Sequence, residues 1–375
     1  MNAPVIIGGG PAGAAAAIRL AQAGHSPLLL ERTEEPTDKV CGDFVGVDAI
    51  GLLQGLGVDP ARLGAAPIRR LRLVYRRKMV EAPLPFPAYG VSRRVLDAAL
   101  QRRAGEAGAT IRTGVAVRRL ERVPAGWQID ASGERLEAAN VFLATGKHDL
   151  RGYPKPGVRT GAVGMKLYLR LAPAQDAVLT GATELYLFSG GYAGLQPVEA
   201  GRTVLCLAVS SASLRPWPAL IAGLTEATPL LQERLTAAEP LLPRPLAVAG
   251  VPYGLLRRST GDPALYRLGD QAAVIPSLTG DGIAIALHSG SLAAQCWLLD
   301  VDAEAYQQHL AQDLARQMRL ATALHRLAMA GAAQGAALHL GRLFPQLLSR
   351  FASGTRLRPT FEMAAGLPTR GLHPA

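Results

Sequence analysis

The chain has 375 residues, of which 49% are hydrophobic, and a formal net charge of +11. This length exceeds what one hydrophobic core usually supports, so we expect two lobes and no extensive disorder. No apolar run approaches the ~20 residues that span a bilayer, and the first strand leaves no room for a signal peptide, which predicts a cytoplasmic protein. Basic residues are dispersed, which argues against nucleic-acid binding. Cys41, Cys206 and Cys296 are widely separated and predict neither disulfides nor a metal site.

The first thirty-two residues predict a strand–helix–strand unit that binds a dinucleotide. An apolar run ends at Gly8, and the G-x-G-x-x-G spacing continues with Gly10 and Gly13 before an Ala-rich helical stretch. Gly8 permits a tight turn, Gly10 lets the backbone approach a pyrophosphate, and Gly13 lets helix and strand pack closely. A second apolar run stops at Glu31, an acid suited to a ribose hydroxyl. The alternative is a glycine-rich turn in an ordinary βαβ unit, and these residues leave the identity of the dinucleotide open.

The middle of the chain predicts a helix, a group of short strands and then a second, sheet-based lobe. The helix begins near Val91 with Ser92 as its cap and ends by Gly108. Strand-like runs then occupy residues 110–112, 115–122, 127–129 and 140–144, and later 165–171, 184–188, 203–209 and 246–254. The later group surrounds one helical stretch at 217–235.

The final third predicts a return to the first lobe, followed by helices. Residues 265–290 contain a strand, a glycine-rich turn and a helix, and residues 303–351 are helical in pattern. We therefore expect a discontinuous first domain, an inserted substrate domain and a C-terminal helical region, comprising residues 1–158 with 262–300, 159–261, and 301–375 respectively. A ligand site is expected in the cleft between the first two domains.

The return segment makes the prediction more specific. Gly269-Asp270 is followed by Pro276, and then by a Gly-x-Gly at Gly280 and Gly282 that opens a helix. Together with the N-terminal G-x-G-P-A-G, this resembles the FAD-binding fold of para-hydroxybenzoate hydroxylase relatives, a superfamily that includes flavin monooxygenases and geranylgeranyl reductases. The resemblance implies an α/β protein with a discontinuous Rossmann-like FAD-binding domain, an inserted β-sheet substrate domain and C-terminal helices. It implies FAD as cofactor and NAD(P)H as a transient reductant.

The resemblance also implies roles for individual residues. Asp270 is expected to bind the ribityl chain (the alternative is a strand-end acid), and Pro276 to lie beside the isoalloxazine ring. The helix after Gly282 directs its N-terminus at the ring, and we expect Asp281 to cap that helix with its side chain. Arg93 is expected to reach FAD phosphates or ribityl oxygens, although an ion pair with Asp97 is the alternative. The candidate cofactor-binding residues are Gly8, Gly10, Pro11, Ala12, Gly13, Glu31, Arg32, Cys41, Gly42, Arg93, Gly269, Asp270, Pro276, Gly280, Gly282 and Ile283.

The reaction depends on residues outside the phosphate loop. The run Asp38-Lys39-Val40-Cys41-Gly42 is similar to the K-x-C-G segment of geranylgeranyl reductase-like flavoproteins, which lies over the flavin. We expect Lys39 to favour the Cys41 thiolate, with a packing cysteine as the alternative. Tyr192 matches the first position of the family's Y-x-W-x-F-P segment, whose inner aromatics are missing here. The Asp that hydroxylases place before a glycine is missing at Thr145. Cys41 and Tyr192 are the candidate catalytic residues, and the other candidates near the substrate are Tyr168, Tyr186 and His148.

These features predict an FAD-dependent monooxygenase acting on a small or lipophilic organic substrate. The alternatives are a geranylgeranyl reductase-like enzyme that reduces or dehydrogenates carbon–carbon bonds, and a non-catalytic flavin- or nucleotide-binding protein. The apolar C-terminal stretches 328–340 and 343–351, which adjoin Arg342 and Arg350, either pack on the FAD lobe or dock on a membrane to collect a lipophilic substrate. The sequence predicts no oligomeric state.

Overall fold

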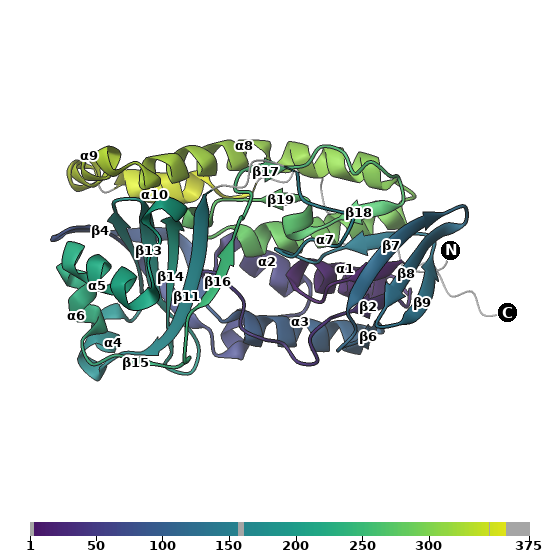
Figure 1. Ribbon diagram of the computed structural model, residues 1–375, viewed down its shortest axis with the longest axis horizontal. Helices are drawn as coiled ribbons and strands as arrows, with labels where there is room; N and C mark the ends of the chain where they lie inside the picture. Colours follow the sequence, from purple (N-terminus) through teal and green to yellow (C-terminus); the bar gives the residue numbers. More distant parts are fainter. Residues whose placement is uncertain (1–3, 157–160, 345, 358–375) are drawn as a thin grey trace.

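The computed structural model describes residues 4–156, 161–344 and 346–357, which form two lobes around two different sheets (Figure 1). The first sheet is parallel, with five strands in the order β18-β10-β1-β2-β6. These strands are β1 (Val5–Ile7), β2 (Leu28–Leu30), β6 (Thr110–Arg112), β10 (Val141–Leu143) and β18 (Leu265–Arg267). Because β18 pairs with β10, the chain leaves this sheet, builds the second lobe and returns to the sheet edge. The predicted α/β class is confirmed.

Each face of the parallel sheet is covered by a different layer, because side chains alternate along each strand. Ile6 packs against helices α1 (Pro11–Gln22), α3 (Arg93–Ala107) and α7 (Gly282–Leu298). Val5 and Ile7 face the small antiparallel sheet of β7 (Val117–Val123), β8 (Gly126–Ala131) and β9 (Glu134–Ala138). The helix predicted near Val91 begins at Arg93, and the Ser92 hydroxyl caps it by accepting a hydrogen bond from Val95 N.

The second sheet has nine strands, eight of them in the order β15-β11-β14-β13-β12-β4-β5-β3, while β16 pairs with β11. The strands are β3 (Phe44–Val45), β4 (Ala66–Tyr75), β5 (Lys78–Gly90), β11 (Ala162–Arg170), β12 (Ala182–Phe188), β13 (Gly191–Pro197), β14 (Thr203–Ser210), β15 (Glu239–Pro240) and β16 (Leu246–Ala249). The predicted boundaries assign residues 66–90 to the FAD-binding domain, but the structure uses them as the long hairpin β4–β5 of this large sheet. Strand β12 pairs with β4 in parallel, so the two parts of the chain form one sheet.

Helices cover both faces of the large sheet. One face packs on α5 (Trp217–Ala227) and α6 (Pro229–Leu235), with α4 (Pro173–Leu179) beside them. The other face lies under the C-terminal helices, which are α8 (Ala303–Met329), α9 (Gly331–Leu343) and α10 (Gln346–Gly354). Helix α8 runs across both lobes and contacts β18 at one end and β13 at the other (Figure 1). The short helix α2 (Val47–Gly55) and the strand pair β17 (Leu255–Leu256) and β19 (Ala273–Val274) lie between the sheets. Within the described ranges, no helix combines the length and apolar character needed to cross a membrane.

The close approach of α7 to α1 gives a stability prediction. A Cβ built at Gly290 would lie 2.0 Å from the carbonyl oxygen of Ala12. We expect Gly290→Ala to lower the free energy of unfolding by about 2 kcal/mol, because neither backbone can move aside. Gly223→Ala in α5, where a Cβ meets no atom within 4 Å, should raise it by about 0.5 kcal/mol through helix propensity. Chemical denaturation measures both variants, and equal stabilities would contradict the close packing.

Candidate active site

The phosphate loop between β1 and α1 has the geometry that its glycines predict. Gly8 has a φ of +110°, and a Cβ at Gly13 would stand 1.9 Å from the Gly8 carbonyl oxygen. Helix α1 starts at Pro11 directly after Gly10, with no side chain capping its first N–H groups. Those N–H groups are therefore available to a phosphate. Ala12, the second residue of α1, packs against the return segment, since its Cβ lies 3.2 Å from a Cβ built at Gly269.

Glu31 is buried beside this loop at the end of β2. Its Oε2 accepts a hydrogen bond from Gly9 N at 2.7 Å, and its Oε1 accepts from Thr33 Oγ1 at 2.9 Å. Gln101 on α3 donates to the Gly9 carbonyl at 2.8 Å, so the loop is held from both sides. Arg32 is exposed and contacts His148 instead, with Nη2 and Nε2 2.8 Å apart. The ribose role of Glu31 and the cofactor role of Arg32 stay predictions.

Arg93 forms the ion pair with Asp97 and lies beside the phosphate loop, while its contact with FAD stays a prediction. Its guanidinium pairs with the buried Asp97 at 2.8 and 2.9 Å, and its Nη2 lies 3.2 Å from a Cβ built at Gly10. Burial alone would lower the pKa of Arg93, but Asp97 raises it above its ordinary value and keeps the cation. Lys39 also pairs with Asp97, at 3.0 Å, rather than with the Cys41 thiol. The site thus places a fixed positive charge beside the loop that is expected to hold a pyrophosphate.

Asp270 lies in the turn at the end of β18 and forms an ion pair that the sequence did not predict. Lys147 Nζ lies 3.3 Å from Asp270 Oδ2, and this carboxylate raises the pKa of Lys147. Gln271 donates to Thr145 Oγ1 at 2.8 Å and to the carbonyl of Gly146, which fixes the loop after β10. Lys147 lies in the loop that follows the buried strand β10, next to β1, and that position is the signal that marks it as a site residue.

The Cys41 turn is fastened to the large sheet by side chains from three of its strands. Cys206 Sγ on β14 donates to the Cys41 carbonyl at 2.9 Å, and Gln196 on β13 donates to the Gly42 carbonyl at 3.0 Å. Lys166 on β11 donates to the Lys39 carbonyl at 3.1 Å. The position of Cys41 is therefore set by the inserted lobe rather than by its own neighbours in sequence.

Asp43 completes this attachment from a buried position. Its Oδ2 accepts hydrogen bonds from Lys166 Nζ and Tyr168 OH, both at 2.6 Å, and all three side chains are buried. Burial raises the pKa of Asp43, and the Lys166 ammonium opposes that effect. Tyr168 therefore binds the Cys41 turn through Asp43 and does not line the cavity described below. Tyr186 is likewise engaged, because its hydroxyl bonds Glu184.

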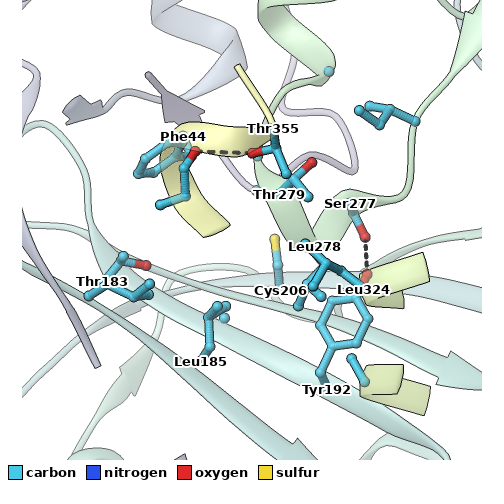
Figure 2. A pocket seen from close by; sticks show the side chains of 18 of the residues that line it. Phe44, Thr183, Leu185, Tyr192, Cys206, Ser277, Leu278, Thr279, Leu324 and Thr355 are labelled. Carbon is cyan, nitrogen blue, oxygen red and sulfur yellow. Dashed lines mark hydrogen bonds between the residues drawn. The ribbon is translucent and has the colours of Figure 1, made fainter. Parts of the chain in front are cut away.

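A cavity of about 630 Å³ begins beside these groups and extends between the large sheet and the C-terminal helices. At the flavin end, a Cβ at Gly42 or Gly282 would meet no atom within 4 Å, so both backbones face open space. The predicted residues that line the cavity are Cys41, Gly42, Tyr192, Asp270, Gly280, Gly282 and Ile283. Figure 2 shows the aliphatic wall, with Leu185 and Leu324 among the labelled side chains, and the hydrogen bond at Ser277. Pro276 lines a separate pocket together with Tyr253 and His325.

Asp281 occupies the N-cap position of α7, but the prediction for its side chain is wrong. The carboxylate makes no capping hydrogen bond and instead pairs with Arg356 at 2.6 Å. Arg356 also donates to the Thr279 carbonyl at 2.9 Å and lies over the Phe86 ring. Arg356, which follows α10, is therefore the partner of this carboxylate in place of the N–H groups of α7.

The comparisons with known proteins agree with this geometry. Residues 2–137 match the family model described as an FAD binding domain. Menaquinone reductase of Mycolicibacterium smegmatis is 29% identical over 78% of this chain and 75% of its own length. Digeranylgeranylglycerophospholipid reductase 2 of Methanopyrus kandleri is 29% identical over 81% of this chain and 77% of its own.

Solved structures share the fold. A geranylgeranyl bacteriochlorophyll reductase-like protein from Thermoplasma acidophilum has a TM-score of 0.73 at 19% identity, covering 90% of each chain. The halogenase PltM in complex with phloroglucinol and FAD has a TM-score of 0.73 at 15% identity, covering 94% of this chain and 85% of its own. The family model and these two reductases support an FAD-dependent oxidoreductase. The chain is similar in sequence to both reductases and shares its fold with the geranylgeranyl bacteriochlorophyll reductase-like protein.

Loss of the Asp270 carboxylate should weaken FAD retention. We expect Asp270→Ala to lower flavin affinity at least about tenfold, because a charge-assisted hydrogen bond is lost and Lys147 is left unpaired. The ratio of flavin to protein absorbance after gel filtration measures retention. Glu137→Ala, an exposed carboxylate of the same lobe, is the matched control and should keep full flavin. Equal flavin occupancy in both variants would contradict the ribityl role.

Asp281 should make stability depend on pH. Burial raises its pKa to about 7 from an ordinary value of 3.8. Between these two values the folded chain binds more protons at this site than the unfolded chain, so its contribution to stability falls as pH rises. We expect Asp281→Asn to remove this contribution to the pH dependence of the free energy of unfolding. Urea titrations across this pH range measure it, with the exposed Glu226→Gln as control. An unchanged slope in Asp281→Asn would contradict the shift.

Proposed function

We propose that the protein reduces a carbon–carbon double bond in a lipophilic, isoprenoid-bearing substrate, using FAD that is reduced by NAD(P)H. The observation that carries this proposal is the cavity, which starts at Cys41 and Asp270 and continues along an apolar wall to α8 and α9. A long hydrocarbon chain suits such a wall, and its double bond would then lie at the flavin end. The relatives named menaquinone reductase and digeranylgeranylglycerophospholipid reductase support reduction over oxygenation.

The missing aromatics of the Y-x-W-x-F-P segment are compatible with this substrate class. Gly194 and Gln196 stand where the family has its inner aromatics, and both line the cavity. Gln196 also holds the Cys41 turn through the Gly42 carbonyl. The two replacements therefore leave room for a chain and keep the turn in place.

Bound reduced FAD supplies the hydride, and the protein must supply a proton to the adjacent carbon. Tyr192 is our candidate donor, because its hydroxyl lies at the cavity wall, 2.7 Å from Ser277 Oγ. Burial raises the pKa of Tyr192, which keeps the hydroxyl protonated. His325 Nδ1 lies 3.5 Å behind that hydroxyl and lines the second pocket, so it is suited to return the proton. We expect Cys41 to position the substrate over the flavin.

Monooxygenation is the second candidate, because the same cofactor and the same apolar cavity would also serve a hydroxylase that must exclude water. The partner in either reaction is a lipophilic small molecule and not a nucleic acid. The free thiols of Cys41, Cys206 and Cys296 support a reducing, cytoplasmic setting.

Single-turnover experiments on the holoenzyme separate the two reactions. With flavin reduced under anaerobic conditions, we expect a menaquinone or a digeranylgeranyl glycerophospholipid in detergent to reoxidise the flavin and gain two hydrogens. Tyr192→Phe should slow this reoxidation about 100-fold and leave flavin reduction by NAD(P)H unchanged. Tyr153→Phe, whose hydroxyl bonds the Leu120 carbonyl outside the cavity, should change neither. Incorporation of labelled oxygen into the product in air would favour the hydroxylase, and no reaction with either lipid would overturn the substrate class.

A further inference from the structure

The far end of the cavity opens at the protein surface between two of the C-terminal helices. Leu327 on α8 and Leu340 on α9 both line the cavity, yet 54% and 46% of their surfaces are exposed. A side chain that is both lining and exposed marks a mouth. The flavin end lies at the opposite side, where Asp270 and Lys147 contribute to the lining.

Exposed apolar side chains gather around this mouth. Leu343 and Phe344 follow Leu340 at the end of α9 and are 59% and 53% exposed, and Met79 on β5 is 42% exposed. Helix α9 packs against β4 and β5, so the β4–β5 hairpin and α9 lie at the same end of the molecule (Figure 1). Within the described residues, five of the eight large hydrophobic side chains that are exposed belong to this set. We call these five residues the mouth surface.

The charge around the mouth surface has one sign. Residues 314–357 contain no Asp or Glu, and the arginines closest in sequence to the mouth surface are Arg326, Arg342 and Arg350. The β4–β5 turn adds the exposed Arg76, Arg77 and Lys78. The acid closest in sequence to this turn is Glu81, which forms an ion pair with Arg72 at 2.6 Å. Exposed leucine and phenylalanine flanked by exposed cations form the pattern of a segment that binds at a membrane interface.

We propose that the mouth surface docks on the face of an anionic lipid bilayer. The apolar side chains enter the acyl boundary, while Arg76, Arg77, Lys78 and Arg342 contact lipid phosphates. A second copy of the chain fits this face poorly, because a two-fold contact would bring the same cations together. Docking would place the cavity mouth against the hydrocarbon, so that an isoprenoid chain enters without crossing water. The docking surface goes beyond the proposed reaction. Only the identification of the entering molecule as an isoprenoid rests on the proposed function.

Co-sedimentation with lipid vesicles tests the surface without turnover. We expect the holoenzyme to bind phosphatidylcholine vesicles that contain phosphatidylglycerol at low salt, and to bind pure phosphatidylcholine at least about tenfold more weakly. Leu343→Ser/Phe344→Ser should weaken binding to the anionic vesicles at least about tenfold. Arg76→Gln/Arg77→Gln/Lys78→Gln should do the same and reduce the salt dependence. Retained flavin absorbance shows that each variant is folded.

Matched variants elsewhere make the test specific. Leu299→Ser removes an apolar side chain that is 55% exposed on the FAD lobe, and Arg118→Gln/Arg119→Gln removes two exposed cations of β7. Both controls should bind vesicles like the wild type. Absence of binding to anionic vesicles, or equal weakening in the controls, would overturn the proposal. So would light scattering that shows a dimer which Leu343→Ser/Phe344→Ser dissociates, because the face would then be a contact between copies. A failure of lipid reduction with intact vesicle binding would overturn the proposed reaction alone.

Discussion

The buried contact of Asp43 with Lys166 and Tyr168 is the interaction on which the arrangement of the site depends. It joins the chain that leaves the parallel sheet to strand β11 of the large sheet, in a place from which water is excluded. Removing one partner of a buried ion pair typically costs about 3–5 kcal/mol, since the other charge is left uncompensated. The two lobes therefore have one stable relation to each other, and Cys41 occupies a fixed place between them. The flavin end of the cavity takes its shape from that relation.

Polar and apolar functions are divided along the cavity. Fixed charges, namely Arg93 with Asp97 and Lys147 with Asp270, lie at the end where the phosphates and the ribityl chain of FAD are expected. Beyond Tyr192 the lining is mostly aliphatic, and both the large sheet and the covering helices contribute to it. The proposed reduction of an isoprenoid chain suits this division, because charge is required only at the reacting atoms.

The sequence was sufficient for those parts of the site that local spacing determines. The glycines of the phosphate loop, the acid at Glu31, the capped helix at Arg93 and the Gly269-Asp270 turn each depend on a few neighbouring residues. The remainder depends on partners far apart in the chain. The sequence around Lys166 shows only a strand residue, because its partner Asp43 is 123 positions away in the chain. The sequence around Asp281 suggests a local helix cap, because its partner Arg356 follows the last helix. The predicted boundaries include residues 66–90 in the FAD-binding domain for the same reason, since the pairing of β4 with β12 is not visible in the pattern of these residues.

The return of β18 to the parallel sheet has a consequence for biosynthesis. The strand that completes this sheet, and the helix α7 that packs on the phosphate loop, are translated after the whole inserted lobe. Arg356, which neutralises the acid at the start of α7, is translated later still. A ribosome-bound chain that ends before residue 265 thus holds the nucleotide loop without the elements that complete its site. Flavin capture on this topology is a late event, and the substrate lobe must emerge before the cofactor can be retained.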